Sequence, residues 1–129
     1  MNVFVPRDAA RAALSTNPAR PATAVVIDTA DVRALVFRLA PGQAVPAHRN
    51  ASTVLLTVLE GQGILSGEEN GAPVDRECRA GDMIVYAPGE LHAMRAVDTE
   101  LLLLATITPR PGERNADGSM RGDRPGESR

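Results

Sequence analysis

Residues 23–108 consist of short apolar runs separated by turn residues, and this spacing most constrains the fold. Turn signals recur about every 8–12 residues, which is typical of all-β sandwiches and barrels. Little helical periodicity interrupts the pattern. The runs expected to form strands are Thr23–Asp28, Val32–Ala40, Thr53–Leu59, Ile64–Ser66, Val74–Cys78, Met83–Tyr86, Leu91–Ala96 and Glu100–Thr108. The pattern predicts an all-β, antiparallel domain.

Two segments of different composition flank this region. Residues 1–22 are rich in Ala, Arg and Pro, and Asp8 is expected to cap a short helix over Ala9–Leu14. A helix of this length is not stable alone, so it must pack on the domain or stay loose. Residues 109–129 hold mainly Pro, Gly, Arg, Asp and Ser, which predicts a flexible tail. We therefore expect an N-terminal arm, a barrel over 23–108 and a tail.

The composition excludes several functions. The 129 residues carry a net charge of −2 and include no Trp, one Tyr and two Phe, which argues against nucleic-acid binding. All 14 basic residues are Arg, so lysine Schiff-base chemistry and a Walker-type phosphate loop are excluded. The lone Cys78 cannot form an intramolecular disulfide. No apolar run approaches the roughly 20 residues of a membrane helix. With no secretory signal evident, we expect a cytoplasmic protein without nucleic-acid or membrane partners.

Two motifs carry a resemblance to a known family. The segment Gly42-Gln-Ala-Val-Pro-Ala-His-Arg-Asn50, followed by Val54 and Gly61, resembles the first motif of the cupin superfamily. The segment Gly81-Asp-Met-Ile-Val-Tyr-Ala-Pro-Gly-Glu-Leu-His92 resembles the second. The resemblance implies a small single-domain bacterial cupin with a double-stranded β-helix, or jelly-roll, barrel. In that family the first motif supplies two histidines and a glutamate, the second supplies a histidine, and together they bind one divalent metal.

The chain departs from this ligand pattern. His48 and His92 occupy histidine positions of the two motifs, whereas Asn50 stands at the second histidine position and Val54 at the glutamate position. Two neutral imidazoles and an amide oxygen make a weak site, because no carboxylate neutralises the metal charge. We therefore expect either no cofactor or a divalent metal (Fe, Mn, Ni or Zn) in an incomplete site, with Asn50 a weak ligand.

The barrel interior is the expected ligand-binding region, because small barrels can enclose an apolar pocket. Strand parity and motif position select the side chains expected to line it, which are His48, Asn50, Val54, Leu56, Tyr86, His92 and Met94. Among the acids, Glu60 is expected at a barrel rim and Glu90 in the loop before His92. Glu68 and Glu69 are expected in a solvated turn, and Cys78 as a small buried hydrophobe.

Three functions remain open at this point. The first is a binding module that takes a small organic molecule in its lumen, with or without weakly bound metal. The second is a metal-dependent cupin enzyme of the dioxygenase, isomerase or decarboxylase type that uses His48 and His92. The third is metal-free acid–base catalysis by a lumen histidine, which needs an acidic or tyrosine partner such as Tyr86.

A homodimer is also expected, because an open barrel leaves strand edges that need cover and Val3–Val5 is an apolar segment suited to pairing. Deleting residues 1–7 should then give monomers or aggregates in multi-angle light scattering. A dimer that survives the deletion would exclude this segment from the interface.

Overall fold

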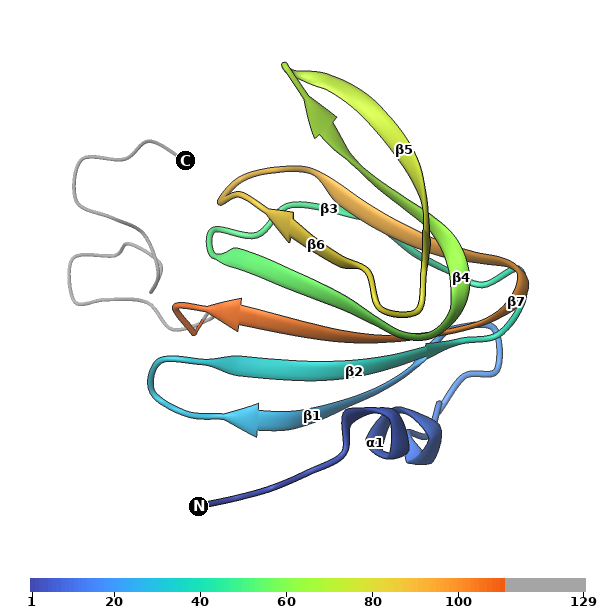
Figure 1. Ribbon diagram of the computed structural model, residues 1–129, viewed down its shortest axis with the longest axis vertical. Coiled ribbons are helices and arrows are strands. Elements are labelled where there is room, and N and C mark those ends of the chain that lie inside the picture. Colours follow the sequence, from blue (N-terminus) through green and yellow to red (C-terminus); the bar gives the residue numbers. More distant parts are fainter. Residues whose placement is uncertain (111–129) are drawn as a thin grey trace.

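The computed structural model describes residues 1–110, so almost all of the predicted tail (109–129) lies outside the described residues. The elements in chain order are α1 (Pro6–Ala12), β1 (Ala22–Asp28), β2 (Arg33–Leu39), β3 (Ala44–His48), β4 (Thr53–Glu69), β5 (Ala72–Arg79), β6 (Met83–Tyr86) and β7 (His92–Thr108). The strands curl into an open barrel, from which the β4–β5 hairpin projects (Figure 1). This confirms the predicted all-β, double-stranded β-helix fold with one short N-terminal helix.

Two long strands belong to both layers of the barrel. β4 pairs with β6 through its first part and with β5 through its second part, and it pairs with β7 along most of its length. β7 pairs with β2 near its end and with β3 near its start. One layer therefore runs β1-β2-β7-β4-β6, and the other runs β3-β7-β4-β5. β5 and β6 do not pair with each other, so the barrel has an opening between them.

The expected strand breaks at Glu60–Gly63 and at residues 97–99 are wrong, because β4 and β7 run through them. The register between the two strands shifts there instead. A Cβ on Gly61, whose φ is +80°, would lie 1.8 Å from the carbonyl oxygen of Glu100, and one on Gly63 would lie 2.4 Å from that of Arg95. Because glycine has no side chain, the two paired strands can approach closely and bend together here, and both strands continue.

The core lies between the two layers. Its fully buried side chains are aliphatic residues from β2, β4 and β7, namely Leu39, Leu56, Val58, Leu101 and Leu103. Cys78 is buried with them, as the sequence predicts. Burying each such aliphatic side chain stabilises the fold by about 1.5–3 kcal/mol before entropy costs. The core is therefore packed with side chains along the middle of the barrel.

Helix α1 packs on the outer face of the sheet. Ala10 is fully buried against Val36 of β2 and Leu102 of β7. The prediction that Asp8 caps this helix is wrong, since the N-cap residue is Val5 and makes no side-chain cap. Pro6 begins the helix instead, because its fixed φ suits the first helical position, and Asp8 lies in the first turn.

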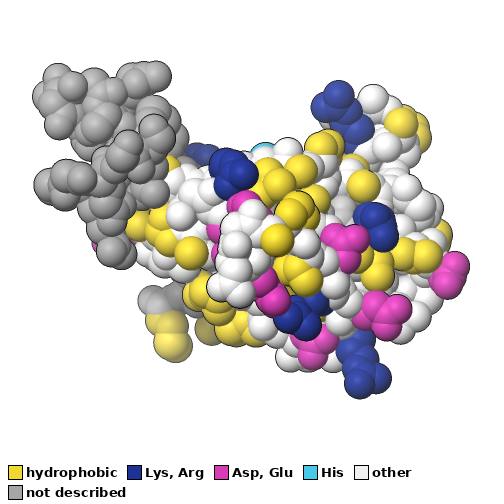
Figure 2. Space-filling view, turned by 90° about the horizontal axis from the view of Figure 1, so that it is seen from above, with side chains coloured by type: hydrophobic (Ala, Val, Ile, Leu, Met, Phe, Trp, Pro, Cys, Tyr) yellow, Lys and Arg dark blue, Asp and Glu magenta, His cyan; other side chains and the backbone are white. Residues whose placement is uncertain are grey.

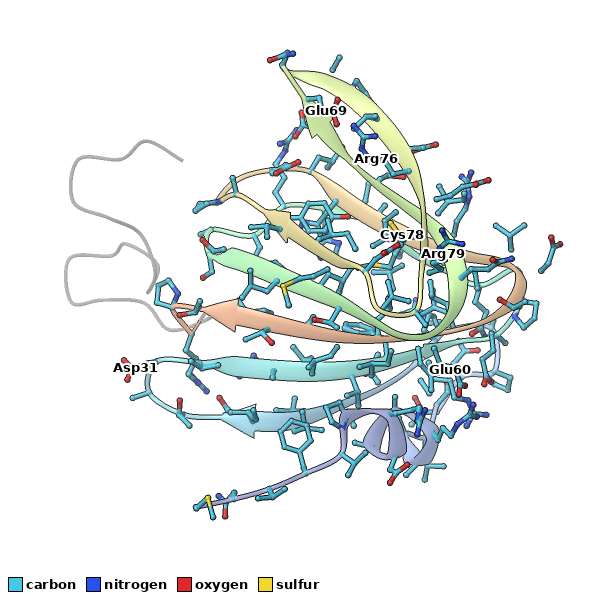
Figure 3. All side chains as sticks on the ribbon, viewed as in Figure 1. Asp31, Glu60, Glu69, Arg76, Cys78 and Arg79 are labelled. Carbon is cyan, nitrogen blue, oxygen red and sulfur yellow. The ribbon has the colours of Figure 1, made fainter. Side chains whose placement is uncertain are left out.

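Charged groups fasten the same helix. Arg11 forms ion pairs with Glu60 and Glu100, and Arg38 donates a hydrogen bond to the carbonyl oxygen of Arg11. Glu60 lies beside α1 (Figure 3). No helix within residues 1–110 is long and apolar enough to cross a membrane.

The bend of β4 predicts a large difference between two glycines that share a positive φ. Gly71 has φ +78° and a Cβ added there would meet nothing within 4 Å, whereas Gly61 faces the Glu100 backbone. Gly71→Ala should lower the free energy of unfolding by about 1 kcal/mol, and Gly61→Ala by about 3 kcal/mol or more. Urea unfolding followed by circular dichroism measures both. Equal losses would contradict the account of the bend.

Candidate functional site

Three aromatic rings meet at one end of the barrel. His48, the last residue of β3, pairs in register with His92, the first residue of β7. Their ring centroids lie 4.0 Å apart at an interplanar angle of 63°. Tyr86 of β6 stacks on His92 with a centroid separation of 4.7 Å. His48 is exposed, whereas His92 and Tyr86 are buried, so the row of rings leads from solvent into the core.

Backbone carbonyls fix both imidazoles. Nδ1 of His48 lies 2.9 Å from the carbonyl oxygen of Pro46, and Nδ1 of His92 lies 3.2 Å from that of Glu90. A carbonyl only accepts, so each ring must donate from Nδ1. The neutral rings therefore keep the lone pair on Nε2, which is the arrangement that suits a ligand or a metal ion.

Burial also sets the ionisation of His92. The pKa of His92 lies below its ordinary value, mainly because burial disfavours the charged ring, and the charge of His48 lowers it further. The hydrogen bond to the Glu90 carbonyl opposes this shift. His92 is consequently neutral at pH 7.

The hydroxyl of Tyr86 is held in its neutral form. Burial raises the pKa of Tyr86 to about 12, with smaller contributions from Cys78 and Glu90. The hydroxyl donates a hydrogen bond to the carbonyl oxygen of Ser66 at 3.0 Å. Tyr86 therefore anchors β6 to β4 and is a poor general base at neutral pH.

Glu68 supports the loop that precedes His92. Its Oε1 accepts hydrogen bonds from the backbone N–H of Leu91 at 2.7 Å and from Nη1 of Arg49 at 2.8 Å. Arg49 also donates to the carbonyl oxygen of Gly89 at 2.7 Å. The Leu91 hydrogen bond, followed by Arg49, lowers the pKa of Glu68. The prediction that Glu68 lies in a solvated turn is wrong, because β4 continues to Glu69 and places this carboxylate over the loop.

Glu90 closes the same loop from within. Its two carboxylate oxygens accept hydrogen bonds from the backbone N–H groups of Ala87 at 3.0 Å and Glu68 at 3.1 Å. Gly67 makes room for it, since a Cβ there would lie 3.0 Å from Glu90 Oε2 and 3.1 Å from the Tyr86 ring. The sequence analysis did not predict these hydrogen bonds of Glu68 and Glu90, because most of the partners are far apart in the chain.

The side chains around the histidines do not fit the metal site that the fold family implies. Oδ1 of Asn50 accepts a hydrogen bond from the backbone N–H of Ser52 at 2.9 Å. Val54 is 3% exposed and offers no donor atom. Glu90 is engaged by backbone N–H groups. No group of three or more His, Cys, Asp or Glu in residues 1–110 could hold a metal ion. Two imidazoles are fewer than the three or four protein ligands of zinc sites and the two histidines and one carboxylate of non-haem iron sites.

The predicted lumen-lining residues do not share one cavity: His48, Asn50 and His92 belong neither to the core cluster nor to a described pocket. Val54, Leu56 and Met94 lie in the packed core. A pocket of about 320 Å³ instead opens between β5 and β6, with Tyr86 in its wall. Leu65, Ile84 and other residues of β4, β5 and β6 complete it. Tyr86 thus connects the pocket to the histidine pair.

The raised pKa of Tyr86 predicts an alkaline loss of stability. The neutral hydroxyl is favoured in the folded state, so its contribution is full below pH 10 and is lost as pH rises towards 12. The free energy of unfolding should fall by roughly 2–3 kcal/mol over this pH range. Because Tyr86 is the only tyrosine, absorbance at 295 nm in a stopped-flow pH jump measures its ionisation directly. A midpoint near 10 in the folded protein would contradict the burial argument, and Tyr86→Phe is the blank.

Comparisons with known proteins agree with this architecture. Residues 35–108, more than half of the chain, match the Cupin domain family. A double-stranded β-helix protein of Klebsiella pneumoniae aligns with TM-score 0.71 and 19% identity, covering 84% of this chain and 90% of that one. A Thermus thermophilus protein aligns with TM-score 0.72 and 24% identity, covering 86% and 100%.

An RmlC-like cupin of Desulfovibrio desulfuricans aligns with TM-score 0.63 and 26% identity, covering 76% of this chain and 91% of that one. A search of curated proteins found no match. With the family match over most of the barrel and these structural likenesses, the chain belongs to the cupin family.

Proposed function

We propose that this cupin barrel binds a small organic molecule in the pocket between β5 and β6, and that binding needs no tightly held divalent metal. The observation that carries the proposal is the pocket of about 320 Å³ whose wall contains Tyr86, the ring that stacks on His92. Its size lies at the lower end of the range for small-molecule sites.

The pocket wall combines apolar and charged groups. Its apolar part comes from Leu65, Val74, Ile84 and Val85, which suit the hydrocarbon body of a ligand. Arg76 and Glu69, an ion pair at the projecting hairpin, lie in the same wall (Figure 3). Such a pocket favours a small amphipathic molecule that presents both an apolar and a polar group to this wall.

The hydrogen bonds of Glu68 and Glu90 support ligand binding in this pocket. Glu68 and Glu90 line the pocket, and their carboxylates already hold the loop before His92. A ligand entering there meets groups whose positions are fixed before it binds, so little ordering entropy is lost on association. A ligand in contact with Tyr86 would also influence His92, because the two rings are stacked.

The alternative is a metal-dependent cupin enzyme that uses His48 and His92. One observation favours it, since both imidazoles donate from Nδ1 to backbone carbonyls and keep Nε2 available. Against it stands the apolar Val54 at the position of the family's carboxylate. Metal-free acid–base catalysis has less support, because the Glu90 carboxylate is engaged by backbone N–H groups and the Tyr86 hydroxyl by Ser66.

Tyrosine emission tests the proposed function. The protein has no Trp and one Tyr, so a ligand beside Tyr86 changes the emission of a single fluorophore. The probes are hexanoate, hexylamine and hexanol, three six-carbon compounds that differ in charge and do not absorb at the excitation wavelength. We expect at least one to give a saturable change that Val74→Phe weakens by about tenfold, or about 1.4 kcal/mol.

The matched control is Val97→Phe, since Val97 is a partly exposed valine that lines a different pocket. This variant should bind the probes like the wild type. Failure of all three probes to saturate, or equal weakening by Val74→Phe and Val97→Phe, would contradict binding at the β5–β6 opening.

A further inference from the structure

A second pocket, separate from the proposed ligand site, lies where β4 and β7 bend. It has a volume of about 430 Å³ and is lined by residues from β4, the end of β5, the turn after β5 and the bend of β7. Val97 and Asp98 in its wall belong to β7, and no residue of β7 lines the pocket between β5 and β6. Cys78 lines both pockets and stands in the wall between them.

Charges of both signs line this second pocket. Arg79 supplies a guanidinium, and Glu77, Asp82 and Asp98 supply carboxylates. Acidic and basic side chains also alternate with apolar ones on the face seen from above (Figure 2). The three carboxylates outnumber the one guanidinium, so the pocket as a whole is acidic.

Arg79 differs from the other strand arginines. In strands β1–β7, Arg33, Arg38, Arg76 and Arg95 each have a carboxylate partner. Arg79 is the only strand arginine of residues 1–110 whose guanidinium forms no ion pair, although it lines a pocket with three acids. Glu77 and Asp98 likewise form no ion pair within the described residues. Opposite charges thus face one cavity without contacting each other.

The backbone beneath Arg79 is held in place. Asp82 Oδ2 accepts a hydrogen bond from the backbone N–H of Arg79 at 2.9 Å, and the backbone N–H of Asp82 donates to the Arg79 carbonyl at 3.0 Å. The next residue, Ala80, donates to the carbonyl oxygen of Gly61 at 3.0 Å. Arg79 and Cys78 lie together at the end of β5 (Figure 3). The side chain of Arg79 therefore projects from a fixed turn.

We propose that this pocket binds a small zwitterion that carries one carboxylate and at least one ammonium group. The planar guanidinium of Arg79 offers paired N–H donors that match a carboxylate, and the carboxylates of Glu77 and Asp98 match ammonium groups. A ligand with both a carboxylate and an ammonium group pairs with the guanidinium and with the carboxylates, which do not pair with each other in the cavity. The excess of carboxylates favours a ligand with two ammonium groups over one with a single ammonium.

Isothermal titration calorimetry on the full chain, at low ionic strength, tests the site with three probes. Ornithine carries one carboxylate and two ammonium groups, putrescine lacks the carboxylate, and norvaline lacks the second ammonium. We expect ornithine to bind more tightly than either of the others. Arg79→Gln should weaken ornithine binding at least tenfold while leaving putrescine binding unchanged or stronger. The double variant Glu77→Gln/Asp98→Asn should weaken the binding of both probes.

The matched control is Arg20→Gln, which removes another arginine without an ion pair in residues 1–110, outside the pocket. It should bind ornithine like the wild type, and thermal unfolding verifies that every variant folds. Val97→Phe should weaken ornithine binding, and Val74→Phe should not. Failure of the zwitterion proposal can therefore be told apart from failure of the proposed function, which the tyrosine-emission test addresses. The proposal is overturned if ornithine does not bind, if Arg79→Gln binds it normally, or if putrescine binds as tightly as ornithine.

Discussion

The fold depends on the close approach of β4 and β7 at their common bend. Gly61 and Gly63 place the β4 backbone against carbonyl groups of β7 where no side chain fits, and both strands continue from one layer into the other. This continuity leaves β5 and β6 at the edges of different layers. The pocket beside Tyr86 exists because those two edges do not meet. The second pocket lies at the bend itself, so both cavities derive from the same backbone constraint.

The histidine pair lies beside two motif positions that hold other residue types, Asn50 and Val54. His48 and His92 face each other across paired strands, and backbone carbonyls orient both rings. Val54, however, belongs to the apolar core, and Asn50 stabilises its own turn. The burial that stabilises Val54 would penalise a charged group at the same place. Stability of the core and divalent metal binding are thus opposed at this position.

Much of the fold could be predicted from the sequence, because the apolar runs and glycine landmarks are local signals. The two motifs also identified His48 and His92 as candidate site residues. The bend could not be predicted, since Gly61 indicates a strand end unless the position of Glu100 is known. The role of Glu68 was missed for the same reason: its partners Leu91 and Arg49 are close only after folding. Long-range contacts therefore account for the main corrections.

The metal content of the purified protein tests the central claim, that this cupin works without a divalent metal held tightly by His48 and His92. Tag-free protein prepared without chelator would be analysed by plasma mass spectrometry beside His48→Ala/His92→Ala, with Asn50→His/Val54→Glu as a variant that restores the family's ligand types. We predict iron, manganese, nickel and zinc far below one equivalent in the wild type and no difference from the double alanine variant. Near-stoichiometric metal in the wild type that disappears in the alanine variant would contradict the account and favour the metal-dependent enzyme.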